Sequence, residues 1–139
     1  MNKPVVIDSS AFISLGTVAD SNYKKATLIS DKIQEDNRAI VMPGDVFTEI
    51  LNIVGKKVGH KIAIEQANHI FFSKAINVEE INSKIRQSAF EKFKMQPNSV
   101  SFTDCSVMAF ADEFETKEIF GFDEAFRKNG YLRIGIDEN

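Results

Sequence analysis

Four acidic residues of this 139-residue chain lie where their neighbours predict a strand end or the buried side of a helix. They are Asp8, Glu49, Asp104 and Asp123. If they converge, their mutual repulsion raises their pKa values or requires a bound cation. A group made only of carboxylate oxygens suits a hard divalent ion such as Mg²⁺ or Mn²⁺. Such an ion can activate water and neutralise the charge of a phosphoryl transition state.

Asp8 and Asp123 each follow a short apolar run, Val-Val-Ile before the first and Ile-Phe-Gly-Phe before the second. In parallel sheets the functional crevice lies at the carboxyl ends of the strands, so both acids are expected at one edge. Aspartate also commonly ends a strand and caps the next helix. Taken alone, each residue therefore fits a functional and a purely structural role equally well.

Glu49 lies at helical spacing from apolar residues such as Val46 and Ile53, which places its carboxylate beside a buried stripe. A charge at such a position is costly unless it finds a partner. The alternative is that Glu49 extends to solvent or forms a local salt bridge, for example with Lys56.

Asp104 begins a segment that is apolar on almost all sides, and Val107 and Met108 share its face. Its carboxylate is therefore expected to point toward the interior or a cleft. The alternative is a capping box in which Ser101 and Asp104 stabilise the first helical turn. The two roles are compatible.

Apolar periodicity and turn residues predict strands that alternate with helices along the whole chain. The alternation is typical of an α/β domain with a mostly parallel sheet, and without a repeat or linker it predicts one domain, residues 1–139. Strands are predicted at 5–7, 39–42, 75–78, 118–122 and 131–134, and helices at about 9–15, 20–36, 45–55, 60–72, 79–95 and 102–113.

Composition restricts the compartment and the partners. The net charge of −3 argues against a protein that coats nucleic acid by charge alone, although a local basic patch remains compatible with it. Cys105 is the only cysteine, so no intrachain disulfide can form, and a reducing, cytoplasmic location is expected, with Cys105 as a small core residue. The first apolar run is three residues long, so we expect no signal peptide and no membrane span.

Four segments together resemble the PIN-domain family, in the family's order and at its usual spacing. They are VVIDSSAF at 5–12, FTEILN at 47–52, SFTDCS at 101–106 and FGFDEAF at 120–126. The resemblance covers nearly the whole chain and implies a single PIN-like nuclease domain. Its fold would be a three-layer α/β/α sandwich around a mostly parallel sheet of about five strands.

The resemblance also implies roles for the acids. Asp8, Asp104 and Asp123 would hold Mg²⁺ or Mn²⁺ directly or through water, and Glu49 would complete the site and help to orient the attacking water. The reaction would be hydrolysis of RNA phosphodiester bonds. Ser10 and Thr103 match small polar positions beside the acids, where hydrogen bonds that orient the ligands are expected.

Some family members carry a further acid one turn after the third aspartate, where this chain has Val107 and Met108. One metal ion is therefore expected rather than two. PIN domains of this size resemble VapC-type toxins of toxin–antitoxin pairs, which form homodimers and are silenced by a small antitoxin protein. Other readings are a catalytically silent PIN-like module that binds RNA or protein, and a PIN nuclease of RNA processing. A receiver domain or a haloacid-type phosphatase would need further acids beside Asp8, where Ser9 and Ser10 stand.

Two groups of basic residues could bind RNA phosphates. The first follows the Glu49 helix and contains Lys56, Lys57, His60 and Lys61. Its alternative role is to complement the dipole at a solvated helix end. The second contains Arg127, Lys128 and Arg133.

Overall fold

The computed structural model describes residues 3–137, which form five strands and seven helices. The strands are β1 (Val5–Ile7), β2 (Ile40–Pro43), β3 (Ile76–Glu79), β4 (Glu118–Phe120) and β5 (Leu132–Arg133). The helices are α1 (Ser9–Leu15), α2 (Tyr23–Glu35), α3 (Gly44–Lys57), α4 (His60–Phe72), α5 (Ser83–Phe93), α6 (Phe102–Glu113) and α7 (Glu124–Lys128). The predicted alternation of strands and helices is confirmed.

α2, β4 and β5 are each two to four residues shorter than predicted, and two other elements differ more. α5 begins at Ser83 rather than near Glu79, because β3 continues to Glu79 and Asn82 caps the helix by accepting a hydrogen bond from the Ile85 amide (2.9 Å). α7 was not predicted at all. Its five residues are too few to show a helical period.

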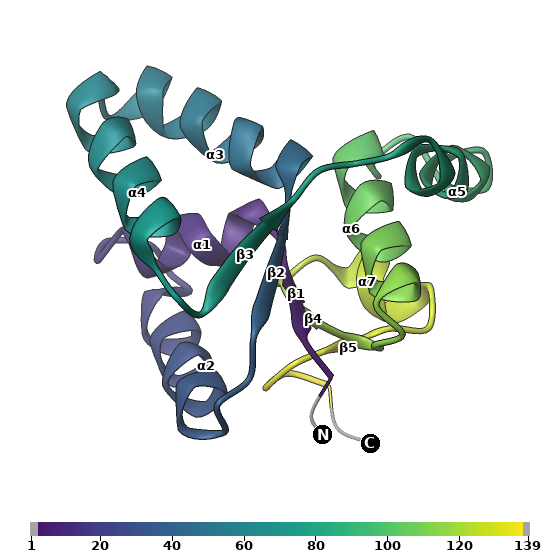
Figure 1. Cartoon of the computed structure of the whole chain (residues 1–139), viewed down its shortest axis with the longest axis horizontal. Helices are drawn as coiled ribbons and strands as arrows, with labels where there is room; N and C mark the ends of the chain where they lie inside the picture. Colours follow the sequence, from purple (N-terminus) through teal and green to yellow (C-terminus); the bar gives the residue numbers. More distant parts are fainter. Residues whose placement is uncertain (1–2, 138–139) are drawn as a thin grey trace.

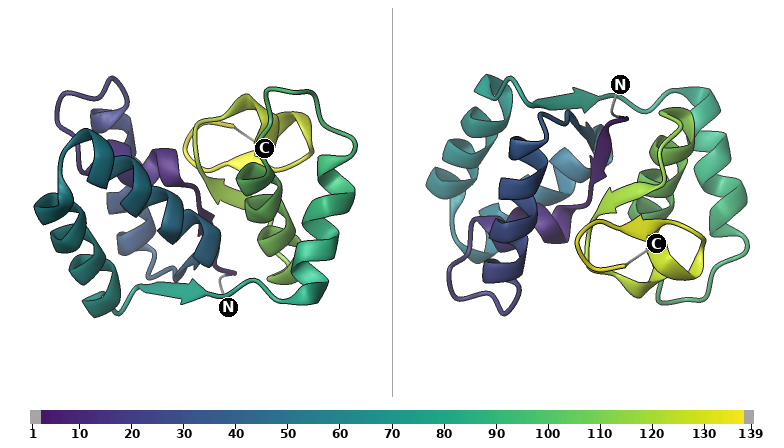
Figure 2. Two further views of the ribbon diagram at one scale, coloured as in Figure 1. Left: turned by 90° about the horizontal axis from the view of Figure 1, so that it is seen from above. Right: turned by 90° about the horizontal axis from the view of Figure 1, so that it is seen from below.

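All strand pairings are parallel, and the strand order is β3-β2-β1-β4-β5. The sheet separates two groups of helices, with α1 to α4 on one side and α5 to α7 on the other (Figure 1). β3 forms one edge and links α4 to α5 (Figure 2). This arrangement is the predicted three-layer α/β/α sandwich.

The central strands are apolar because both of their faces are covered. Every residue of β1 and β2 is buried, as expected for the middle of a parallel sheet between two helical layers. β3 at the edge is only partly buried. Cys105 on α6 is fully buried, as predicted. Within residues 3–137 the longest helix, α3, has 14 residues, and no helix is long and apolar enough to cross a bilayer.

The register brings the ends of three strands to one edge. Ile7 of β1 pairs with Phe120 of β4, and the Asp8 amide donates to the Phe120 carbonyl (2.9 Å). On the other side of β1, Val6 pairs with Val41, two residues before β2 ends at Pro43 and α3 begins. Asp8, the start of α3 and the segment after β4 therefore lie at the same carboxyl edge.

Gly121 lies at the most crowded point of this edge. A Cβ atom at this position would lie 2.8 Å from Cε2 of Phe126 and 3.0 Å from Cβ of Asp8. Phe126 is fully buried and Asp8 almost so, so neither can move away easily. Glycine at this position therefore lets the segment after β4 pass against Asp8.

We predict that Gly121→Ala lowers the free energy of unfolding by about 1–3 kcal/mol, the usual cost of overpacking a core. Gly55→Ala is the matched control. It lies inside α3, its Cβ would make an ordinary 3.5 Å contact with His60, and alanine favours a helix by up to about 1 kcal/mol. Urea unfolding of both variants tests the expected opposite signs, and a Gly121→Ala protein as stable as Gly55→Ala would contradict the crowding.

Candidate active site

The four predicted acids come from four different elements around the carboxyl edge of the sheet. Asp8 follows β1, Glu49 lies in the second turn of α3, Asp104 in the first turn of α6, and Asp123 directly before α7. The charges of Asp104 and Glu49 both act on Asp8, and those of Asp123 and Glu49 act on Asp104. The fold therefore brings together residues that are more than a hundred positions apart in the chain.

Each of the four carboxylates has an oxygen fixed by a nearby hydroxyl or amide. Ser10 Oγ donates to Asp8 (2.9 Å), and Ser9 Oγ donates to Glu49 (2.6 Å). Asp104 accepts from the Ser101 amide (3.1 Å), and Asp123 accepts from the Ala125 amide (2.8 Å). These bonds restrict how each carboxylate can turn before anything binds to it.

Asp8 is the most strongly perturbed of the four. Only 4 % of its surface is exposed, and this burial is the main reason that its pKa rises from 3.8 to about 7. The negative charge of Asp104 raises the pKa further, and that of Glu49 adds a smaller effect. Hydrogen bonds from Ser10 and the Ser9 backbone oppose the rise without cancelling it.

Asp104 also has a raised pKa, chiefly because it is partly buried and then because Asp123 and Glu49 are negative. Its hydrogen bonds with Ser101 form a complete capping box, in which the Asp104 amide also donates to Ser101 Oγ (3.1 Å). The structural role considered from the sequence is therefore real. It accompanies the electrostatic coupling to the other acids rather than replacing it.

No lysine, arginine or histidine within residues 3–137 forms an ion pair with any of the four acids. The salt bridge considered between Glu49 and Lys56 is not formed, since Ser9 is the partner of Glu49. A cluster of oxygen ligands with uncompensated negative charge fits a hard divalent cation. In the described part of the chain, however, no three acidic, histidine or cysteine residues already surround one point as a metal site does.

Three further polar residues join this region and were not singled out from the sequence. Ser9 orients Glu49, and the buried Ser106 donates to Asp45 (3.1 Å), which lies one turn before Glu49 on α3. The i, i+4 spacing of Asp45 and Glu49 was a usable signal, as was the hydroxyl of Ser106 in an otherwise apolar helix.

Thr103, which was predicted to lie beside the acids, lines a shallow hollow of about 320 Å³ together with Glu49. Its side chain has no hydrogen bond within residues 3–137.

The first basic group lies at the far end of α3 from the acids. α3 begins beside α6 and ends where it turns into α4 (Figure 1). Lys56 and Lys57 close α3, and His60 and Lys61 open α4, with all four side chains exposed. At the rise of an α-helix, Lys56 is roughly 10 Å along the axis from Glu49. The group is therefore near the acids but does not line the same hollow.

The second basic group does not form one patch. Arg133 is buried and donates to the Phe122 carbonyl (2.9 Å), to Asp137 (2.9 and 3.0 Å) and to Glu124 (3.3 Å). It thereby ties down both neighbours of Asp123. The guanidinium of Arg133 also lowers the pKa of Asp137. Arg127 is exposed and paired with Glu124, so Lys128 is the residue of the three that has no ion pair with any residue from 3 to 137.

Comparison with known proteins supports the resemblance drawn from the sequence. The model of the PIN domain family matches residues 5–130. The crystal structure of VapC20 from Mycobacterium tuberculosis, a toxin that cleaves the sarcin–ricin loop, superposes with a TM-score of 0.78 at 18 % sequence identity. The match covers 94 % of this chain and 98 % of that one. None of the curated proteins matches the chain by sequence.

We predict that metal-free protein loses stability as the pH rises from about 4 to 7. Below this range Asp8 is protonated in both the folded and the unfolded chain. Within it, only the unfolded chain ionises, because folding raises the pKa from 3.8 to about 7. This difference between the pKa values of the folded and unfolded chain lowers the free energy of unfolding by a total on the order of 4 kcal/mol. The full loss is reached above pH 7.

Asp8→Asn removes this ionisation and is the direct test. In EDTA, its gain in unfolding free energy over the wild type should be larger at pH 8 than at pH 5 by roughly 2–3 kcal/mol. Urea unfolding at the two pH values measures the difference. An equal gain at both values would show that Asp8 ionises alike in the folded and unfolded chain.

We predict that Arg133→Met lowers the free energy of unfolding by about 2 kcal/mol, because it removes the partner of the Asp137 carboxylate, whose side chain is only 11 % exposed. Combining it with Asp137→Asn should recover part of the loss. Arg127→Met, which breaks only an exposed pair, is the control and should have little effect. If the double variant loses as much unfolding free energy as the two single variants together, Arg133 does not stabilise the protein through Asp137.

Proposed function

We propose that this chain, which belongs to the PIN-domain family, is a metal-dependent endoribonuclease that hydrolyses RNA phosphodiester bonds. The observation that carries the proposal is the group of four carboxylates, one of them almost fully buried, which no basic side chain within residues 3–137 pairs with. A divalent ion would compensate this charge and can also activate water for phosphodiester hydrolysis. Mg²⁺ or Mn²⁺ fits the oxygen ligands.

In this proposal, Asp8, Asp104 and Asp123 bind the ion directly or through water, and Glu49 completes the site. The ion would supply charge neutralisation at the phosphate and a more acidic water. Ser10 and Ser9 hold Asp8 and Glu49 in place, so that Glu49 is positioned to orient the attacking water. Thr103, beside Glu49, is a further candidate for contact with that water or with the RNA.

One metal ion is the simpler proposal. A second ion would need a further acid in the turn after Asp104. That turn carries Val107 and Met108 instead, and both are fully buried. Asp45 is the nearest additional acid on α3, but it accepts a hydrogen bond from Ser106. Its carboxylate is therefore already committed to holding α3 against α6.

We also propose that the protein is the toxin of a toxin–antitoxin pair. The support is its fold likeness to VapC20 over almost the full length of both chains. Partners of this class would be a second copy of the chain and a small antitoxin. Phe71 and Phe72 at the end of α4 are 64 % and 83 % exposed, and such apolar surface is available for a protein partner.

RNA would reach the acids along a surface that carries separated cations. Lys56, Lys57, His60 and Lys61 are exposed at the far end of α3, where they could bind phosphates away from the cut. The acids themselves repel phosphate until an ion is bound. The proposal therefore assigns binding and cleavage to different residues.

The test is cleavage of labelled RNA by the purified protein with Mg²⁺ or with EDTA. Asp8→Asn and Asp104→Asn should each lower the rate at least roughly 100-fold, because residues that only orient a metal ligand already cost about 10- to 100-fold. Asp31→Asn, an exposed acid on α2, is the matched control. The two site variants should also lose the rise in melting temperature that Mg²⁺ gives the wild type.

The outcomes separate the alternatives. Metal-dependent cleavage that survives both substitutions would sink the site assignment. RNA binding without cleavage of any structured or unstructured RNA would favour the catalytically silent module. Loss of cleavage together with an unchanged Mg²⁺ effect on melting would mean that the acids act without holding the ion.

A further inference from the structure

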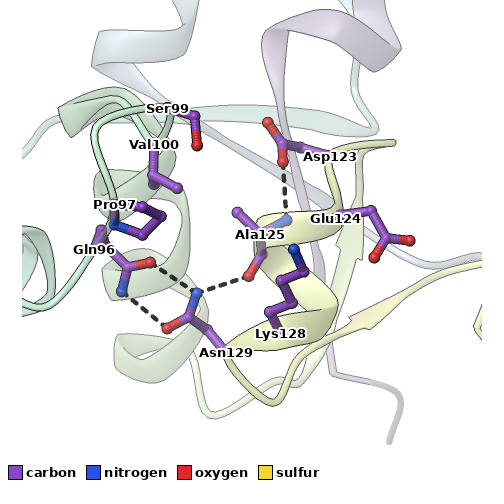
Figure 3. A pocket seen from close by; sticks show the side chains of 9 residues that line it. All are labelled: Gln96, Pro97, Ser99, Val100, Asp123, Glu124, Ala125, Lys128 and Asn129. Carbon is purple, nitrogen blue, oxygen red and sulfur yellow. Dashed lines mark hydrogen bonds between the residues drawn. The ribbon is translucent and has the colours of Figure 1, made fainter.

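A hollow of about 310 Å³ lies directly beside Asp123, between α7 and the loop that joins α5 to α6 (Figure 3). We call it the α7 hollow. Its volume is at the lower end of the range for ligand pockets, roughly 300–1,000 Å³, which suits a single nucleotide and not a folded RNA element. One wall comes from the loop and the other from α7, so a strand that crosses Asp123 passes its mouth.

The walls combine apolar and polar surface in the way that a nucleobase requires. Pro97 and Val100 on the loop face Ala125 on α7, and Val100 and Ala125 are buried. Pro97 is exposed and offers apolar surface to a base, and Val100 and Ala125 add the small part of their side chains that is not covered. Gln96 and Asn129 supply polar groups at one end of the hollow.

The two amides form a closed pair whose orientation is fixed. Asn129 Nδ2 donates to the Ala125 carbonyl (2.7 Å) and to Gln96 Oε1 (3.1 Å), so the other atom of the amide must be the oxygen. That oxygen accepts from Gln96 Nε2 (2.9 Å). An amide nitrogen has two donors and an amide oxygen two acceptor sites. One N–H of Gln96 and one acceptor site on each oxygen therefore remain for a ligand.

Lys128 supplies the charge. Lys128 lines the same hollow. Among the described residues it has no ion pair, whereas Arg127 pairs with Glu124 and Arg133 with Asp137. Side chains on a helix lean toward its N-terminus, and Lys128 reaches back along α7 toward the end that carries Asp123 (Figure 3). A phosphate bound to it would lie between the hollow and the acids.

We propose that the α7 hollow binds one nucleotide of the RNA next to the phosphate that is cut. The base lies between Pro97, Val100 and Ala125, its edge meets the amide pair of Gln96 and Asn129, and Lys128 holds its phosphate. The inference rests on the proposed ribonuclease function, whose site it extends by a position that selects the base. It makes Gln96 a specificity-determining residue, whereas the acids are indifferent to sequence.

The direct experiment observes the amide pair itself. Side-chain NH₂ groups give their own signals in ¹⁵N–¹H spectra, and the Gln96→Ala and Asn129→Ala variants assign them. In EDTA, where no cleavage is expected, the labelled protein is titrated with each of the four nucleoside 5′-monophosphates and with inorganic phosphate. Both side-chain signals should shift and saturate with at least one nucleotide and stay in place with inorganic phosphate.

Two substitutions refine the test. Lys128→Gln should lower the affinity for the nucleotide roughly fivefold, which is the effect of one exposed ion pair. Lys25→Gln on α2 should leave the affinity unchanged. If inorganic phosphate shifts the two amide signals as much as the nucleotides do, the hollow binds anions without recognising a base, and the proposal is overturned. Absence of any shift with all four nucleotides would also overturn it.

Cleavage of a random-sequence RNA, with sequencing of the new ends, separates this inference from the function on which it rests. Wild-type protein should prefer one base beside the cut, and Gln96→Ala should reduce that preference by roughly tenfold, the value of one good polar contact to a base. Gln87→Ala, an exposed amide on α5, is the control. Shifts without cleavage of this RNA or of any structured RNA would support the nucleotide site and refute the ribonuclease function. Cleavage with an unchanged base preference in Gln96→Ala would refute the nucleotide site alone.

Discussion

Asp8 has to be buried, because it follows β1, the middle strand of a sheet that helices cover on both faces. A carboxylate in that position is stable only if it stays protonated or meets a positive charge. The fold provides Ser10 and the Ser9 backbone as hydrogen-bond donors, and it places Asp104 and Glu49 nearby as further negative charges. The carboxyl edge thus carries negative charge that no basic side chain within residues 3–137 neutralises, and this is the physical basis for the proposed metal site.

The hydrogen bonds around the acids explain how such a group can persist without a metal. Asp104 completes the capping box of α6, and Asp123 caps α7. Both acids therefore stabilise helix ends while they repel other members of the group. A structural role for an acid is no argument against a functional one, since the same hydrogen bond that caps a helix also sets the direction of the carboxylate.

The sequence predicted the parts of the fold that depend on local burial. The apolar runs of β1 and β2 and the buried stripe of α3 repeat at the period of their element, and these elements were predicted close to their observed bounds. Asp8 and Asp123 were predicted to lie at one edge because each follows a parallel strand, whereas Glu49 and Asp104 were grouped with them through the family resemblance. α7 escaped prediction, because a five-residue helix has no period to detect.

What the sequence could not supply are the contacts between distant residues. Ser9 bonds Glu49 across 40 positions, and Ser106 bonds Asp45 across 61. Arg133 looked like one cation of a surface patch, yet it is buried against Asp137 and the Phe122 carbonyl. Charge alone does not reveal whether an arginine faces solvent or completes a local network, since both uses favour the same residue type.

The distribution of the remaining cations bears on how an acidic protein can act on RNA. Arg127 and Arg133 are paired with acids, whereas Lys128 and the basic group at the far end of α3 have no ion pair within residues 3–137. Because α3 is 14 residues long, that group and the start of α3 are separated by about 20 Å. An RNA strand held at both places would cross the acids without close contact to a basic side chain there. The charge at the crossing point would then depend on the bound ion, so the ion would govern both the approach of the phosphate and its cleavage.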